Sequence, residues 1–101
     1  MQRNMTMKTE FREFDVAEYL DSEETIAAYL EVVLSEDDPQ AFIKAIGDIA
    51  RARSMTEISR KTGLARQNLY RQFAEGGNPS FHTVRKVLDA VGVNLVPTAK
   101  A

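Results

Sequence analysis

The feature that most constrains the fold of this chain is a series of helix-start signals, each followed by apolar side chains at helical spacing. At such a start a side-chain oxygen accepts a hydrogen bond from a backbone N–H that has no partner within the helix. The signals stand at Asp15, Asp21, Asp38, Ser54 and Ser80. They predict a mainly all-α fold in which short turns join the helices.

The apolar spacing and the turn residues set the expected extent of each element. The predicted helices are Val16–Leu20, one opened by Asp21 and ended by Ser35–Asp38, one starting at Pro39, then Met55–Thr62, Arg66 to Phe73 or Ala74, and Phe81 to Gly92. Gly47 lies inside the helix that starts at Pro39, where glycine costs about 1 kcal/mol relative to alanine, and a close helix contact would explain it. Residues Val93–Val96 alternate apolar and polar side chains and predict a short strand that Pro97 ends.

A length of 101 residues supports one domain with one modest core. We expect an N-terminal arm over 1–14, a single domain over 15–96 and a tail over 97–101. Within the domain we expect an acidic helical extension over 15–38, a helical core over 39–92 and the strand over 93–96.

Composition argues against catalytic and metal chemistry. The chain has no cysteine and a single histidine, His82, whereas a metal site needs several ligands. Gly76 and Gly77 have the composition of a loop and lack the pattern of a phosphate-binding motif. We therefore expect no enzyme, cofactor or metal. The short apolar runs and the lack of a signal-peptide pattern favour a cytoplasmic protein.

The net charge of −2 conceals two halves of opposite sign. Residues 1–40 carry three basic and eleven acidic side chains, a net charge of −8, whereas residues 41–101 carry ten basic and four acidic ones, a net charge of +6. A basic half attracts phosphate, and an acidic half repels it or binds a basic partner.

The most informative stretch is 54–73, where two short helices are separated by a tight turn containing Gly63. Leu64, Leu69 and Phe73 are expected to hold the second helix to the core, which leaves a polar face exposed. In a helix-turn-helix the second helix enters the major groove of DNA. There arginine can bind the edge of guanine, and glutamine or asparagine can bind the edge of adenine. The expected base-reading residues are Arg66, Gln67, Asn68, Tyr70 and Arg71. The expected phosphate contacts are Ser54, Thr56, Arg60, Lys61 and Arg53.

Several stretches together resemble one bacterial family, the HigA-like antitoxins or addiction-module antidote proteins. They are Phe14–Leu20, Ile26–Leu30, Gly47–Arg53, Gly63–Arg71 and Gly77–Phe81. The segment Met55–Gly92 resembles their Xre/Cro-type helix-turn-helix, and the whole resemblance covers about residues 10–96. It implies a five-helix Xre/Cro-like domain that represses its operon as a DNA-bound dimer and binds a small RelE/ParE-type toxin.

Two positions depart from the family pattern. The family often has serine where this chain has Ala65, so the second helix of the motif loses a cap worth roughly 1 kcal/mol. Gln72 stands where small or apolar residues are usual, so the packing of that helix is expected to differ.

The resemblance gives the acidic half a candidate purpose, because toxins of this type are generally basic. Aromatic anchors among charged side chains are typical of interfaces. The expected toxin-binding residues are Phe11, Phe14, Glu10, Glu13, Asp15 and Glu18. Two other interpretations stay open, a stand-alone Xre-type repressor without a toxin and a protein-interaction module that has lost DNA binding.

A single module of this size has a small DNA footprint, so we expect a homodimer on an inverted-repeat operator. The strand Val93–Val96 is too short to stand alone. It would pair with its copy in the second chain or with Thr9–Glu13.

Overall fold

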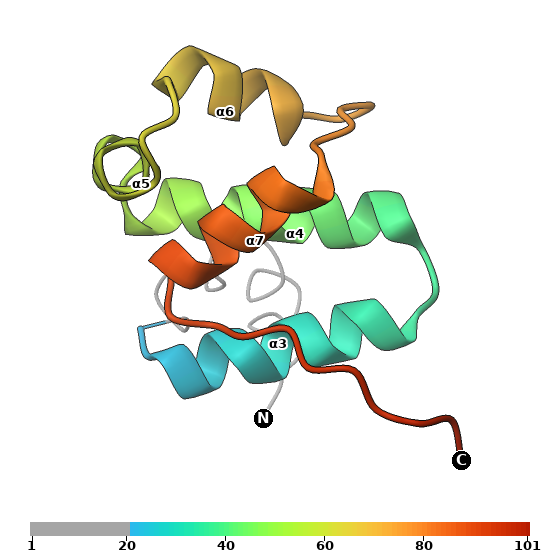
Figure 1. Cartoon of the computed structure of the whole chain (residues 1–101). Helices are drawn as coiled ribbons and strands as arrows, with labels where there is room; N and C mark the ends of the chain where they lie inside the picture. The colour runs from blue at the N-terminus through green and yellow to red at the C-terminus, as the bar shows by residue number, and fades with distance from the viewer. Residues whose placement is uncertain (1–20) are drawn as a thin grey trace, which may run out of the picture.

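The computed structural model describes residues 21–101, and within them the chain folds into helices joined by short connections (Figure 1). The helices are α3 (Glu23–Ser35), α4 (Pro39–Arg53), α5 (Met55–Thr62), α6 (Arg66–Gln72) and α7 (Phe81–Ala90). The predicted all-α class and these five helices are confirmed. The predicted helix Val16–Leu20 and the arm 1–14 lie outside the described residues.

The helix starts follow the predicted caps with one exception. The side chains of Asp38, Ser54 and Ser80 each accept a hydrogen bond from the backbone N–H three residues later, at 3.2, 3.3 and 3.1 Å respectively. The prediction of Asp21 as the cap of α3 is wrong by one residue. Ser22 takes that position, and its hydroxyl accepts from the N–H of Thr25 at 3.2 Å, so Asp21 remains exposed outside the helix.

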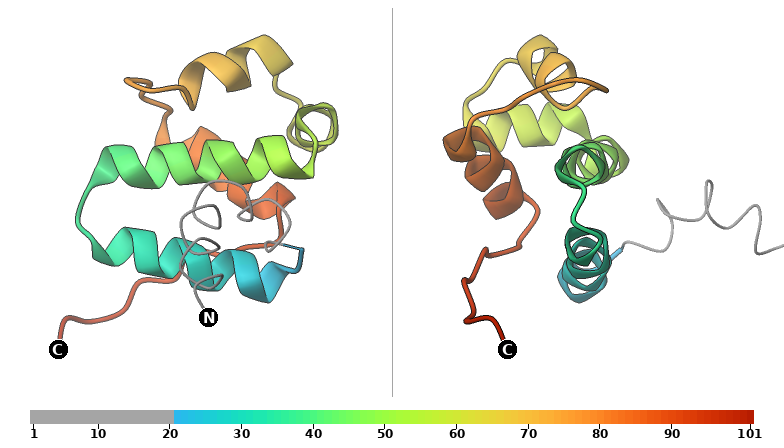
Figure 2. Two further views of the ribbon diagram at one scale, coloured as in Figure 1. Left: turned by 180° about the vertical axis from the view of Figure 1, so that it is seen from behind. Right: turned by 90° about the vertical axis from the view of Figure 1, so that its right-hand side faces the viewer.

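The core lies where the hairpin of α3 and α4 meets α5, α6 and α7. In the right-hand view of Figure 2, α3 and α4 form one layer and α7 packs on one side of it. The largest fully buried side chains come from all five described helices and their ends: Phe73, Ile26, Ile46, Ile49, Ile58, Leu69, Leu88 and Val87. Because apolar burial is the dominant favourable term in folding, this cluster fixes where α5 and α6 stand.

Gly47 of α4 lies close to Phe73, the residue just beyond the end of α6. A Cβ atom built on Gly47 would lie 2.9 Å from both the Cβ and the carbonyl oxygen of Phe73. The close helix contact expected from the sequence is therefore present. It explains why a residue that weakens the interior of a helix stands there.

The strand predicted over 93–96 is not confirmed within residues 21–101. The partners expected from the sequence, a second copy of the segment or Thr9–Glu13, are not among the described residues. The N–H of Val93 instead donates to the carbonyl of Leu88 at 2.9 Å and closes the end of α7. Phe81 belongs to the apolar stripe of α7 by spacing, but it stands at the first helical position, beyond the edge of the core, and is 67% exposed.

Candidate nucleic-acid interface

The turn between α5 and α6 is three residues long and is fixed by side chains of α5. Gly63 has φ +78°, the left-handed conformation that glycine adopts at little cost. The hydroxyl of Ser59 donates to the carbonyl of Leu64, and the N–H of Leu64 donates to the hydroxyl of Thr62 at 3.2 Å. Both ends of the turn are thus tied, so α6 leaves α5 in a defined direction.

The two sides of α6 have opposite character. Leu69 and Phe73 are each 1% exposed and hold the helix against the core. The side chains of Arg66, Gln67 and Arg71 are exposed, and Tyr70 is 41% exposed. A seven-residue helix is too short to be stable alone. The buried side chains of Leu69 and Phe73 therefore determine its position, and its polar side remains free for a partner.

The starts of α5 and α6 lie together. The guanidinium of Arg66 donates to the hydroxyl of Thr56 at 3.2 Å, and Ser54 caps α5 just before Thr56. No side chain caps α6 at Ala65, as the departure from the family pattern predicts. Three of the predicted residues, Arg66 for bases and Ser54 and Thr56 for phosphates, are therefore neighbours.

Asn68 is less available than the sequence indicates. It is half-buried, and its side-chain oxygen accepts hydrogen bonds from the side chains of Arg71 and Gln72. Gln72 is also half-buried, and its own side-chain oxygen is buried without a partner among the described residues. A buried unsatisfied oxygen costs about 1–3 kcal/mol. The expected difference in packing from the family pattern stays a prediction, and the structure adds a destabilising buried oxygen at this position.

The predicted phosphate contacts split into exposed and engaged cations. Arg60 is exposed and donates to both carboxylate oxygens of Glu57, at 2.6 and 2.9 Å. This hydrogen bond lowers the pKa of Glu57 and raises that of Arg60, and the attraction of the two charges acts in the same direction. Arg53 reaches Glu23 of α3 at 3.9 Å, which directs its charge away from α6.

Lys61 takes part in an exchange with α7 that the sequence did not indicate. Its amine donates to the carbonyl of Ala90, at the end of α7, at 3.4 Å. In return, the amine of Lys86 donates to the carbonyl of Thr62, at the end of α5, at 3.3 Å. Lysines favour such helix ends, where backbone carbonyls have no helical partner.

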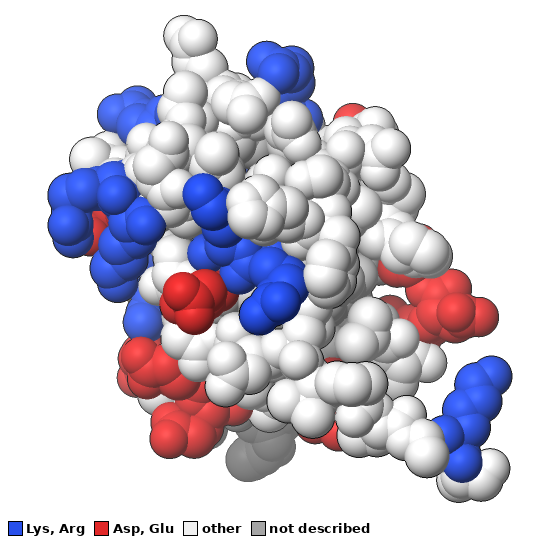
Figure 3. All heavy atoms as spheres, viewed as in Figure 1, with Lys and Arg blue, Asp and Glu red and all other residues white. Residues whose placement is uncertain are grey.

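The charge division seen in the sequence is also a division in space. Figure 3 shows most Lys and Arg over α5, α6 and α7, with a few carboxylates among them, and most Asp and Glu around α3 and its turn into α4. Residues 21–40 contain seven carboxylates and no Lys or Arg. The polar face of α6 therefore stands on the basic side of the molecule.

Comparison with known proteins adds a family. Residues 10–99 match the family described as "Probable addiction module antidote protein". The chain belongs to this family. It is also 46% identical over 89 residues to an uncharacterized protein of Haemophilus influenzae. The aligned residues make up 88% of this chain and 92% of that relative. No solved structure matches the chain.

Membership in the antidote family confirms the broad resemblance seen in the sequence. An antidote acts by binding a toxin rather than by catalysis, so the chain has a toxin partner and is not an enzyme. The family description names neither the HigA-like group nor the Xre/Cro motif, operator DNA or the class of toxin, so these remain predictions.

The predicted toxin-binding residues all belong to the first twenty residues of the chain. They lie outside the described residues and are Phe11, Phe14, Glu10, Glu13, Asp15 and Glu18.

Within residues 21–101 no group of three or more potential metal ligands comes together. None of the helices in this part of the chain is long and apolar enough to cross a membrane.

Proposed function

We propose that this antidote represses its own operon by binding operator DNA through α5 and α6, and that it neutralises a small RelE/ParE-like toxin by direct contact. The observation that carries the DNA-binding part is the two-sided character of α6. Leu69 and Phe73 are buried and hold the helix against the core, while arginine, glutamine and tyrosine side chains face solvent beside the start of α5. This is the arrangement that a helix entering the major groove requires.

The exposed residues have distinct roles in this proposal. Arg66 and Gln67, in the first turn of α6, read base edges, with Tyr70 and Arg71 further along the helix. Asn68 reads a base only after releasing Arg71 and Gln72. Ser54, Thr56 and Arg60 contact phosphates. Arg53 and Lys61 have the smaller share, because Glu23 and Ala90 hold them.

The operator is expected to be an inverted repeat bound by two copies, with half-sites about 34 Å apart or a multiple of that distance. The cytoplasm, where such an operator is found, remains the expected location. One module alone would bury too little surface for tight specific binding.

A mobility-shift titration tests DNA binding. The probes are the DNA fragment upstream of this gene and an unrelated fragment of equal length, each titrated between 50 and 200 mM salt. We expect tighter binding to the upstream fragment and at least a tenfold loss of affinity as salt rises, because bound phosphates release counterions. No shift at 50 mM salt would contradict the proposal and favour a protein-interaction module.

The toxin part is tested separately. We propose that Phe11 and Phe14 are apolar anchors, and that Glu10, Glu13, Asp15 and Glu18 steer a basic toxin toward them. Deletion of residues 1–14 should abolish co-purification with the toxin and leave the mobility shift intact. If the shortened chain still holds the toxin, the contact lies elsewhere, on the acidic face Glu23–Glu36 or the basic half.

A further inference from the structure

The side-chain oxygen of Asn68 is the meeting point of three side chains of α6. It accepts one hydrogen bond from the guanidinium of Arg71 and another from the side-chain nitrogen of Gln72, the latter at 3.4 Å. Residues three and four positions apart lie on the same face of a helix, so the three side chains share one face. Asn68 and Gln72 are half-buried, and Arg71 is exposed. The bonds therefore join a supported inner pair to an arginine in solvent.

These bonds use the acceptor capacity of Asn68. An amide oxygen has two lone pairs, and here each of them has a donor. To pair with the edge of adenine, an asparagine must accept a hydrogen bond from the base as well as donate one to it. With both bonds in place Asn68 has no free acceptor, so it cannot form that pair.

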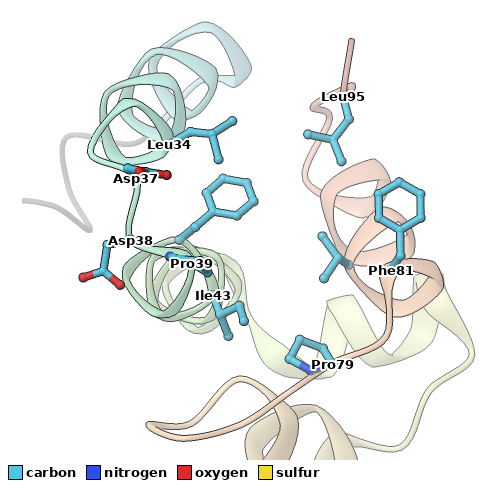
Figure 4. Close-up of a pocket in the computed structure, with 10 residues that line it drawn as sticks. Leu34, Asp37, Asp38, Pro39, Ile43, Pro79, Phe81 and Leu95 are labelled. Atoms are coloured by element: carbon cyan, nitrogen blue, oxygen red, sulfur yellow. The ribbon is translucent and has the colours of Figure 1, made fainter. Parts of the chain in front are cut away.

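The chain that follows α6 supports Gln72. A Cβ atom built on Gly77 would overlap the backbone oxygen of Gln72, so the loop after α6 folds directly against this residue. The same loop is tied to α4, because the side-chain amide of Gln40 donates to the carbonyl of Gly77 at 3.2 Å. Further along, Pro79 is buried and lines an apolar groove together with Ile43 of α4 (Figure 4). The end of α6 is thus a firm support for the side chain of Gln72.

The amide of Gln72 is used in one orientation. Its nitrogen donates to Asn68, and its oxygen is buried without a partner among the described residues. The reverse orientation would bring two oxygens together and lose the bond to Asn68. An apolar side chain of the same length would fill the space without leaving a buried acceptor. The amide is therefore of use through its bond to Asn68 rather than through packing.

The bond to Asn68 also determines where the charge of Arg71 lies. Arg71 belongs to the last turn of α6 and Asn68 to the first. Helical side chains lean toward the N-terminus of their helix, and the bond holds the guanidinium of Arg71 in this direction. In a helix-turn-helix the first turn of the second helix approaches the base edges. Since α6 carries no carboxylate, no ion pair within the helix draws the guanidinium elsewhere.

We infer that Asn68 is a positioning residue, held by Gln72, that keeps the guanidinium of Arg71 beside the first turn of α6, where it reads a guanine. Guanine is expected because a guanidinium donates to its acceptor edge, and the bond to Asn68 leaves the other donors free. An arginine fixed before binding loses less conformational entropy on binding. The inference rests on the proposed function and deepens it, since Asn68 keeps both bonds on DNA and does not read adenine.

Two substitutions of Asn68 separate positioning from base reading. The quantity measured is the affinity for the fragment upstream of the gene divided by that for unrelated DNA. Asn68→Asp keeps acceptor oxygens for Arg71 and Gln72 but removes the N–H groups that a base contact needs, and an acidic residue suits the first turn of a helix. Its negative charge should weaken binding to both fragments alike, which leaves the ratio intact.

We expect Asn68→Asp to lower this ratio less than about threefold, and Asn68→Ala to lower it about five- to tenfold, as Arg71→Ala does. Equal losses in Asn68→Asp and Asn68→Ala would overturn the inference, because they would show that the N–H groups of Asn68 contact a base.

A double variant tests whether Asn68 acts through Arg71. Adding Asn68→Ala to Arg71→Ala should lower the ratio no further, since the side chain that Asn68 positions is already gone. If the losses of the two single variants multiply instead, Asn68 contacts DNA by itself and the inference is wrong.

Gln72→Met separates positioning from a purely structural role. Methionine has a similar length and leaves no buried acceptor, so the midpoint of chemical denaturation should stay the same or rise. The affinity ratio should nevertheless fall about twofold or more, because Asn68 loses its support. An unchanged ratio would overturn the part assigned to Gln72.

NMR of the free chain measures the order of the Arg71 side chain without DNA. The heteronuclear NOE at Nε of Arg71 should exceed that of the exposed Arg85 of α7. It should fall to the level of Arg85 in Asn68→Ala but not in Asn68→Asp. Equal values for the two arginines in the wild-type chain would overturn the inference.

The outcomes also separate this inference from the proposed function. A wild-type chain that does not prefer the upstream fragment would refute the repressor proposal, and the reading of guanine with it. A wild-type chain that prefers this fragment, and loses the preference in Asn68→Asp, would refute the positioning role alone.

Discussion

Helices α3 and α6 stand at opposite ends of the molecule and are held in opposite ways (Figure 1). α3 has thirteen residues, a serine cap and three buried apolar side chains, and residues 21–40 around it carry only negative charges. α6 has seven residues and no cap, and it carries two arginines and no carboxylate. The comparison teaches that α6 owes its place to tertiary packing, which leaves its polar side chains free for a ligand, whereas α3 is supported locally as well.

The largest effect in this comparison is expected from Phe73→Ala. The ring is 1% exposed and fixes the end of α6 against α4, so its removal should cost about 3–5 kcal/mol of unfolding free energy. Denaturant unfolding measures the loss. Where the variant remains folded, hydrogen exchange should show faster exchange in α6 than in α3. Equal acceleration in both helices would contradict the difference between them.

A smaller loss is expected from Gly47→Ala. The new methyl group would press on the Cβ and carbonyl oxygen of Phe73, and overpacking costs about 1–3 kcal/mol. The gain in helix propensity offsets about 1 kcal/mol of this. We therefore expect a net destabilisation in chemical denaturation. An increase in stability would show that the α4–α6 contact yields easily.

Ala65→Ser should move stability in the opposite direction. Ala65 has the extended backbone of a cap residue, φ −66° and ψ 140°, but no side-chain oxygen. A serine hydroxyl there should add about 0.5–1 kcal/mol to the unfolding free energy. Thermal unfolding measures the gain. An unchanged midpoint would mean that the missing cap at the start of α6 does not limit the stability of the fold.

The smallest effect concerns the exposed pair of Glu57 and Arg60. The hydrogen bond from Arg60 lowers the pKa of Glu57 in the folded chain. The pair therefore stabilises the fold at pH values above the ordinary pKa of a glutamate. That contribution is lost as pH falls through the lowered pKa. An NMR titration should show the midpoint of Glu57 rising toward its ordinary value in Arg60→Ala. An unchanged midpoint would argue against the pair.

Local signals in the sequence predicted most of the fold because each has a local physical cause. Asp38, Ser54 and Ser80 cap their helices, and Gly63 turns the chain, through contacts within a few residues. Periodicity identifies the apolar face of a helix but not where the core ends along it, as the 67% exposed Phe81 at the start of α7 shows.

The sequence predicted which residues belong to the candidate site but only some of their contacts. The exposure of Arg66 and Gln67 follows from the spacing of Leu69 and Phe73. The bonds that engage Asn68 and Lys61 depend on rotamers and on the approach of α7, which no spacing records. The strand over 93–96 was predicted from alternating, β-branched residues that Pro97 ends, and its expected partners lie outside residues 21–101, so the strand stays a prediction.

The central claim is that α6 reads DNA sequence, and the ratio of two affinities tests it most directly. The affinity for the fragment upstream of the gene is divided by that for unrelated DNA, in Arg66→Ala and in Arg60→Ala, each of which removes one positive charge. We expect Arg66→Ala to lower this ratio by roughly ten- to a hundredfold, since a base contact is worth about 1–3 kcal/mol. Arg60→Ala should weaken binding to both fragments alike and leave the ratio unchanged. Equal losses on both fragments for Arg66→Ala would contradict the claim.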